Sequence, residues 1–231
     1  MRGMRRLLPS CLLALCLLSA VAYAADPPTV AIVYFDYTGK NQELEVLRKG
    51  LAQMLISDLS GSDAIRVVER DRLEDILAEL KLQGTAKIDP QSAARMGKLL
   101  GAKYLVLGGY FDLAGALRVD ARIVDVETGR VFKSFGANGK PGDFLPVEQK
   151  MATDLGGWFT ANVPAPTAPQ KKPPPPRPPA ALKTKTAVKY AEALALRDSG
   201  NKEKAKQALG NVLKEQPDFV LASLDLDRLM K

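Results

Sequence analysis

The chain of 231 residues contains no histidine and only two cysteines, Cys11 and Cys16. Both cysteines lie in an N-terminal segment that we expect to be removed, so the mature chain would contain neither residue type. This inventory excludes disulfide bonds, thiol nucleophiles, Cys/His zinc sites and Ser-His-Asp triads. The sequence also has no clustered acidic loop of the kind that binds calcium. We therefore expect no metal, no cofactor, no catalytic residue and no enzymatic activity.

The N-terminus has the three parts of a secretory signal. Three arginines lie within the first six residues, residues 7–21 are almost wholly apolar, and Ala22 and Ala24 place small side chains where a signal peptidase cleaves. The apolar run of about 15 residues is shorter than the roughly 20 that a membrane-spanning helix needs. Lipidation is disfavoured, because neither cysteine follows a small residue at the end of the apolar run. Residues 1–24 are thus predicted to be a cleaved signal peptide that exports the chain to the periplasm.

A proline-rich segment divides the mature chain. Residues 164–179 include four consecutive prolines at 173–176, and such a run cannot donate the backbone hydrogen bonds of a helix or sheet. At about 3.1 Å per residue, it would form a polyproline spacer roughly 50 Å long. A spacer is favoured over a ligand for a proline-recognising groove. The predicted parts are an α/β domain at 25–162, a Pro-rich linker at 163–181 and a helical tail at 182–231.

Charge is spread unevenly over these parts. Residues 25–162 carry 17 Lys/Arg against 19 Asp/Glu, whereas residues 163–231 carry 13 against 7. An exported chain without a basic, aromatic face is not expected to bind nucleic acid. The basic tail raises the alternative of peripheral contact with an anionic membrane or polymer, although solvated lysines are the simpler interpretation.

Hydrophobic periodicity predicts alternating strands and helices in the body. Residues 117–123 alternate strictly between apolar and charged side chains, as a half-buried strand does, and Asp89-Pro90 is a helix start signal. The order predicts an α/β (α+β) fold: a mixed sheet of about five strands with packed helices, then the linker and a small helical hairpin domain. The predicted strands are 29–37, 65–68, 104–113, 117–123 and 131–135, and the predicted helices lie near 43–59, 73–80, 90–101 and 145–159.

Carboxylates near strand ends are the candidates for binding a ligand. Asp36 lies near the end of the first predicted strand, where α/β sheets bind their ligands, so it is a candidate ligand-binding residue. Asp120 alternates with Arg118 and Arg122, a pattern typical of a solvated sheet surface with cross-strand charge pairs.

Four segments in order carry a family resemblance. They are Arg66–Leu73, where a strand meets a charged helical turn, Leu82–Gly84, Gly97–Gly108 and Arg122–Val131. Together they resemble the CsgG family, whose namesake is the curli secretion component, and domains like the N-terminal one of TolB share the same outline. The resemblance implies a non-enzymatic periplasmic domain associated with the outer membrane. The chain has no room for the two long membrane hairpins of the namesake, so no channel residue is transferred to it.

The tail resembles one tetratricopeptide unit in part. Small Ala193 and Ala205 would let two antiparallel helices approach closely, with a turn at Gly200 and a third helix after Pro217. Because about three repeats are usually needed for independent stability, we expect the tail to dock on a partner or on another copy of the chain. The side chains expected to make this protein contact are Tyr190, Leu194, Leu196, Leu209, Leu213 and Phe219.

Two functions fit these features. The first is a CsgG-like, outer-membrane-associated component that assists the assembly or export of cell-surface material through protein–protein contacts, with protein partners or a homo-oligomer. The alternative is a periplasmic module that binds or senses a small ligand near Asp36 and carries a helical adaptor tail. A hydrolase is disfavoured by the missing histidine and cysteine.

Overall fold

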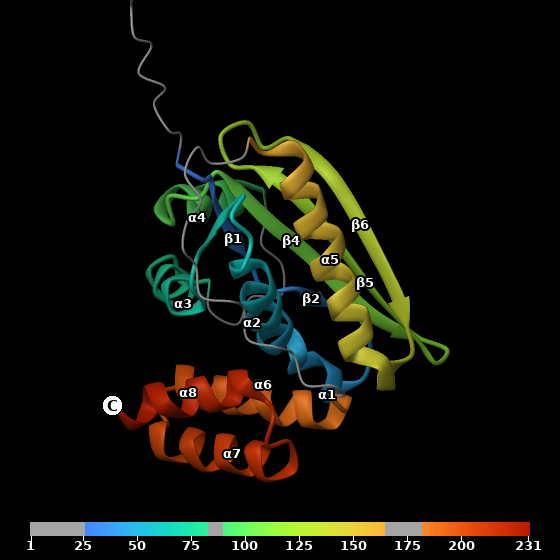
Figure 1. The fold of residues 1–231 in the computed structure, drawn as a ribbon, viewed down its shortest axis with the longest axis vertical. Helices are drawn as coiled ribbons and strands as arrows, with labels where there is room; N and C mark the ends of the chain where they lie inside the picture. Colours follow the sequence, from blue (N-terminus) through green and yellow to red (C-terminus); the bar gives the residue numbers. More distant parts are fainter. Residues whose placement is uncertain (1–25, 83–89, 165–181) are drawn as a thin grey trace, which may run out of the picture.

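The computed structural model describes residues 26–82, 90–164 and 182–231. The predicted signal peptide and nearly all of the predicted linker lie outside these residues. The body contains a six-stranded mixed sheet in the order β3-β1-β4-β5-β6, with β2 pairing to β4 (Figure 1). The predicted α/β fold with a mixed sheet is therefore confirmed, with one strand more than expected.

The sheet has a parallel half and an antiparallel half. Strand β1 runs parallel to β3 and β4, whereas β4, β5 and β6 form an antiparallel meander. The β4–β5 turn has positive φ at both Ala114 (50°) and Gly115 (79°), which matches the twist that two-residue hairpins require. The strands are β1 Thr29–Ile32, β2 Asp36–Tyr37, β3 Arg66–Val67, β4 Tyr104–Leu113, β5 Ala116–Asp125 and β6 Val131–Gly139.

The extra strand arises because the predicted first strand breaks around Phe35. This side chain is fully buried, and its ring lies against Gly108 of β4. A Cβ atom at Gly108 would collide with the Phe35 ring and with the Asp120 carbonyl oxygen. Close packing therefore explains the glycine inside β4, and the chain resumes pairing as β2 beyond it.

Helices cover both faces of the sheet. The larger core lies between the sheet and helices α2 and α5, and the smaller core lies under α3 and α4 (Figure 1). The predicted helix 43–59 is divided in two after Glu45, and Asn41 caps the first piece by accepting a 3.0 Å hydrogen bond from the Glu43 amide. The helices of the body are α1 Gln42–Glu45, α2 Leu47–Ser60, α3 Arg70–Glu79, α4 Pro90–Leu99 and α5 Phe144–Asn162, preceded by a short 3-10 turn at Pro141–Asp143.

Aromatic side chains fix the end of α5 against the sheet. Phe159 is fully buried, and its ring centroid lies 5.9 Å from that of Tyr104. Trp158 packs edge-on to the same tyrosine at 6.2 Å. Such aromatic pairs contribute about 0.5–1.5 kcal/mol beyond their buried area. Trp158 and Phe159 therefore hold the C-terminal part of α5 against the sheet.

The tail consists of three helices, α6 Thr184–Asp198, α7 Lys202–Glu215 and α8 Val220–Met230. Ala193 and Ala205 are fully buried, and Gly200 turns the chain with φ of 79°. The tail lies across the end of α2 (Figure 1), where a Cβ placed on Gly50 would come within 3.1 Å of the Ala191 Cβ. The absence of a side chain at Gly50 is what lets α6 approach α2 this closely. The resemblance to a tetratricopeptide unit stays a prediction.

Candidate functional site

The junction between the body and the tail is built around Arg70. This residue begins α3, and its side chain is only 1% exposed. Its guanidinium donates two hydrogen bonds to Asp198 of α6, at 2.8 Å from Nη1 and 3.0 Å from Nη2. A forked arginine–carboxylate pair of this kind is among the strong, geometrically specific interactions in proteins. The tail is thus anchored to the body by a buried pair that lies 128 residues apart in the sequence.

The body surrounds this pair with three more polar side chains. The Tyr34 hydroxyl accepts a 3.2 Å hydrogen bond from Arg70 and donates to Glu74. Lys49 of α2 forms ion pairs with Asp198 and, at 3.1 Å, with Glu74. Burial raises the pKa of Tyr34, so its hydroxyl stays protonated and remains a donor. Side chains from the end of β1, from α2 and from α3 therefore converge on one carboxylate of the tail.

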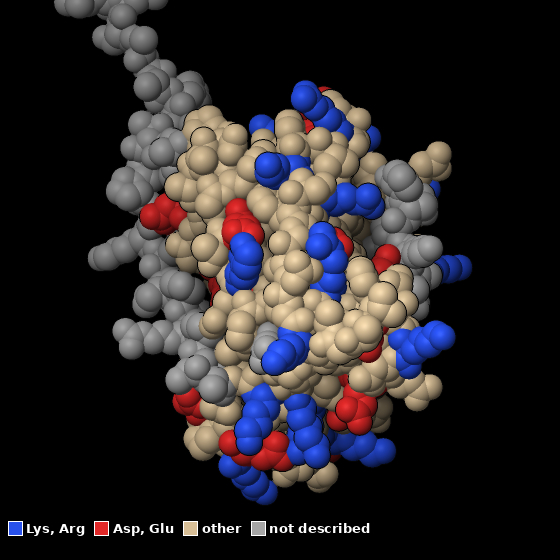
Figure 2. Space-filling model, turned by 90° about the vertical axis from the view of Figure 1, so that its right-hand side faces the viewer, with Lys and Arg blue, Asp and Glu red and all other residues tan. Residues whose placement is uncertain are grey.

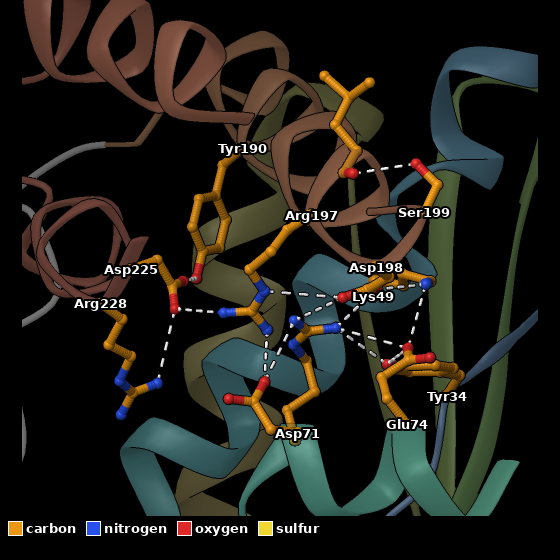
Figure 3. A network of polar contacts seen from close by, with 12 residues as sticks. Tyr34, Lys49, Asp71, Glu74, Tyr190, Arg197, Asp198, Ser199, Asp225 and Arg228 are labelled. Carbon is orange, nitrogen blue, oxygen red and sulfur yellow. Dashed lines mark hydrogen bonds and ion pairs between the residues drawn. The ribbon is translucent and has the colours of Figure 1, made fainter. Parts of the chain in front are cut away.

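A second set of contacts extends the junction through the tail. Arg197 binds Asp225 of α8 at 3.0 Å and Asp71 of α3 at 2.6 Å (Figure 3). Asp225 is 2% exposed and also accepts a 2.6 Å hydrogen bond from the Tyr190 hydroxyl. Burial raises the pKa of Asp225, while the hydrogen bond from Tyr190 and nearby cations lower it in part. We define the junction network as these two connected sets of side chains: Tyr34, Lys49, Arg70, Asp71, Glu74, Tyr190, Arg197, Asp198 and Asp225.

The side chains that sequence reasoning assigned to a partner build the interior of this chain instead. Tyr190 and Phe219 are buried, with ring centroids 4.8 Å apart. The three helices of the tail pack on one another, and α6 also packs on α2, so most of these side chains are not open to a partner here. Leu194 and Leu209 are buried as well, whereas Leu196 and Leu213 are partly exposed. A protein partner would therefore meet other parts of the tail surface.

Asp36 lies in the wall of a cavity. Its Oδ1 atom is 3.5 Å from Nη2 of Arg48, and the cavity beside it measures about 420 Å³. The walls come from the β1–β2 segment and from strands β4, β5 and β6. The expected charge pairing on this surface is corrected in one respect: Asp120 pairs with Arg118 of its own strand, at 2.6–2.9 Å, rather than with a residue of a neighbouring strand.

The sequence did not indicate that the carboxyl of Glu148 is buried. Glu148 of α5 is 1% exposed, and neither of its carboxylate oxygens has a hydrogen-bond partner among the described residues. Burial raises the pKa of Glu148 well above its usual value, and the charge of Asp58 on α2 raises it further. Burial also raises the pKa of Asp58 to about 6. The position of Glu148 on the apolar face of α5, one turn after Phe144, was the only available signal.

These two carboxyls predict an unusual pH dependence of stability. Because their pKa values are higher in the folded chain than in the unfolded chain, the folded state binds more protons between the two values. The free energy of unfolding should therefore fall as pH rises from about 4, the ordinary carboxyl value, through about 6, where Asp58 titrates, and further as Glu148 ionises. Urea titrations across this range measure the effect.

Glu148→Gln should flatten this pH dependence, because an amide keeps the shape of the protonated acid without ionising. The matched control is Glu127→Gln at an exposed turn, which should leave the wild-type slope in place. A wild-type chain that gains stability between pH 5 and pH 8, or a Glu148→Gln chain that keeps the full wild-type slope, contradicts the assignment.

Two other features, a membrane-spanning helix and a metal site, are not found among the residues that the structure describes. Within residues 26–82, 90–164 and 182–231, no helix combines the length and hydropathy of a transmembrane span. The same residues contain no group of three or more histidine, cysteine or acidic side chains placed to hold a metal ion.

The fold and the junction define an α/β domain that carries a docked helical tail. The family model described as "Curli production assembly/transport component CsgG" matches residues 27–114. The match runs from before β1 to the β4–β5 turn, and it confirms for this segment the resemblance predicted from the sequence.

Solved structures show similarity at low identity. The LpoB C-terminal domain from Salmonella enterica has 12% identity and a TM-score of 0.43, covering 52% of this chain and 87% of its own. A lipoprotein from Neisseria meningitidis has 12% identity and a TM-score of 0.42, covering 59% and 100%. TolB from Acinetobacter baumannii has 14% identity and a TM-score of 0.36, covering 61% and 30%. Among curated protein sequences, none matches this chain significantly.

Proposed function

We propose that this chain is a non-enzymatic, exported component of the cell envelope that assists the assembly or export of surface material through protein–protein contacts. The observation that carries the proposal is the match of residues 27–114 to a family described as a curli assembly and transport component. The predicted signal peptide supports a periplasmic location, and the family supports association with the outer membrane.

The exposed surface offers places for such contacts. Leu113 at the β4–β5 turn is 70% exposed, and Met230 at the end of α8 is 69% exposed. Leu224 adds a second exposed apolar side chain on α8. Lys and Arg side chains are scattered over the face in Figure 2 and gather at its lower end, over the tail. With most of its inner apolar side chains buried, the tail presents its outer surface, α8 included, to partners.

Site-specific photo-crosslinking tests the proposal. A photoreactive amino acid at Leu224 or Met230 of the full chain is expected to give discrete adducts in the envelope fraction. The same residue at Gln207, an exposed polar position on α7, is the matched control. The proposal is overturned if the chain fractionates with the cytoplasm, or if neither α8 position gives an adduct absent from the control.

The alternative function, a periplasmic module that binds a small ligand, is favoured by one observation. Asp36, the candidate near a strand end, lines the cavity of about 420 Å³, and this supports the alternative. This volume lies within the range of about 300–1,000 Å³ that ligand sites occupy. Ligand binding and protein contacts use separate surfaces, so the two functions are tested separately.

A further inference from the structure

The floor of the cavity follows from the sheet register. Residues directly opposite each other on paired strands share a face. Leu107, Arg122 and Ser134 are opposite one another on β4, β5 and β6, and they form one row across the sheet. In the next row, Asp36, Gly109 and Asp120 are opposite one another on β2, β4 and β5. All six residues line the cavity.

The hollow exists because the two rows differ in the size of their side chains. Gly109 has no side chain, whereas Leu107 and Arg122 in the other row have long ones. Val33 and Leu107 belong to the core under α3 and α4, so the cavity begins where the cover of these helices ends. A Cβ at Gly109 would lie 2.9 Å from the Asp36 carbonyl oxygen, which shows how closely the β1–β2 segment crosses this row.

The charges of the cavity do not balance. Asp36 forms an ion pair with Arg48, and Asp120 is held by Arg118 through contacts of 2.6–2.9 Å. Arg122 is exposed, and its guanidinium has no ion pair or hydrogen bond with any described residue. The cavity therefore has two neutralised carboxylates and one unneutralised cation at its rim.

The remaining wall of the cavity is apolar and can contact the uncharged part of a ligand. Val33 is 1% exposed, and Leu107 is partly buried and packs against the same core. Phe135 lies opposite Ala121 in the row next to Arg122, so the side chains of both point to the other face of the sheet and pack in the larger core. A ligand in the cavity would thus meet the apolar side chains of Val33 and Leu107 on one side and the Arg122 guanidinium on the other.

We propose that this cavity binds a small organic carboxylate with a short apolar body, and that Arg122 is the residue that binds the carboxylate. The arginine fork matches a carboxylate in two parallel hydrogen bonds. A phosphate also fits such a fork, but the one positive charge of Arg122 that has no partner among the described residues would leave the second negative charge of a phosphate unneutralised. A monoanion is therefore preferred. The proposal rests on the alternative function given above and is independent of the contacts made by the tail.

Titration of the isotope-labelled mature chain, residues 25–231, with sodium benzoate tests the site by NMR. We expect saturable chemical-shift changes at the amides of Gly108, Gly109 and Ser134, with a dissociation constant on the order of 1 mM for a ligand of this size. Benzyl alcohol, the neutral analogue, and inorganic phosphate should each bind at least about tenfold more weakly, because a hydrogen bond to a charged group is worth about a tenfold change or more in affinity.

Two variants assign the effect to Arg122. Arg122→Gln should weaken benzoate binding at least about tenfold, whereas Arg130→Gln, at an exposed arginine outside the cavity, should leave it unchanged. Equal binding by the Arg122→Gln chain and the wild type overturns the proposal. It is likewise overturned if the shifts fall on the tail lysines without saturating, or if phosphate binds more tightly than benzoate. Each of these results leaves the crosslinking outcome at α8 unaffected.

Discussion

Replacing Asp198 with alanine is expected to lower the free energy of unfolding by about 3–5 kcal/mol, the usual effect of removing one partner of a buried ion pair. The Arg70 side chain is 1% exposed and donates two hydrogen bonds to the Asp198 carboxylate. In the variant this guanidinium would stay buried without that carboxylate. Glu74, 3.5 Å from Arg70, compensates for part of the loss, so the lower end of this range is expected. Urea titration followed by circular dichroism measures the change.

The matched control is Asp218→Ala, which removes an exposed carboxylate from the same tail. Substitutions at such surface positions usually change stability by less than about 0.5 kcal/mol. The double replacement Arg70→Met with Asp198→Leu should recover much of the loss, because apolar residues of similar volume often replace a buried ion pair without penalty. If the two single aspartate variants are equally stable, the Arg70–Asp198 pair does not anchor the tail.

Replacing Gly50 with leucine is expected to destabilise the chain by about 1–3 kcal/mol and to displace the tail from the body. Even a Cβ at this position would lie 3.1 Å from the Ala191 Cβ, so a larger side chain must push α6 away from α2. The displacement would expose Ala187, Ala191 and the junction network to solvent. Limited proteolysis measures it as faster cleavage within residues 182–231, and thermal unfolding reports the loss of stability.

The control for this substitution is Gly157→Ala in α5. No atom lies within 4 Å of a Cβ placed there, so only the backbone effect remains. Alanine is favoured over glycine inside a helix by up to about 1 kcal/mol, and this variant should therefore be slightly more stable than the wild type. An intact, protease-resistant tail in the Gly50→Leu chain would show that the α2–α6 contact is not what holds the tail in place.

Local patterns predicted most of the elements of the body. Strand β4 runs from Tyr104 to Leu113, as predicted, because a run of apolar residues between two turn signals is a local feature. The alternation over residues 117–123 likewise identified β5. The break at Phe35 could not be predicted, because it depends on a contact with Gly108 of a distant strand.

The junction was missed for a physical reason. Arg70 and Asp198 both lie in charged, helix-forming segments, where solvent exposure is the ordinary expectation. Their burial depends on a tertiary contact between segments more than a hundred residues apart. The amino-acid composition of the two segments does not indicate this contact. The sequence predicted that the apolar side chains of the tail contact a partner, but it could not indicate that the tail's own helices and α2 of the same chain bury most of them. Asp36 was chosen as a candidate because strand ends are a general site for ligands, whereas Arg122, which also lines the cavity, was assigned to the solvated sheet surface because of its alternation with Asp120.

Tyr34 contributes to both the cavity and the junction network. The residue lines the cavity, and its hydroxyl lies between Arg70 and Glu74 in the junction network. A molecule that moved Tyr34 would also change the hydrogen bonds that anchor the tail. Thermodynamic linkage then requires symmetry: whatever factor an occupant of the cavity applies to the docking equilibrium of the tail, docking applies the same factor to the affinity for that occupant. If the cavity takes the proposed ligand, this one tyrosine would therefore couple the occupancy of the cavity to the docking of the tail.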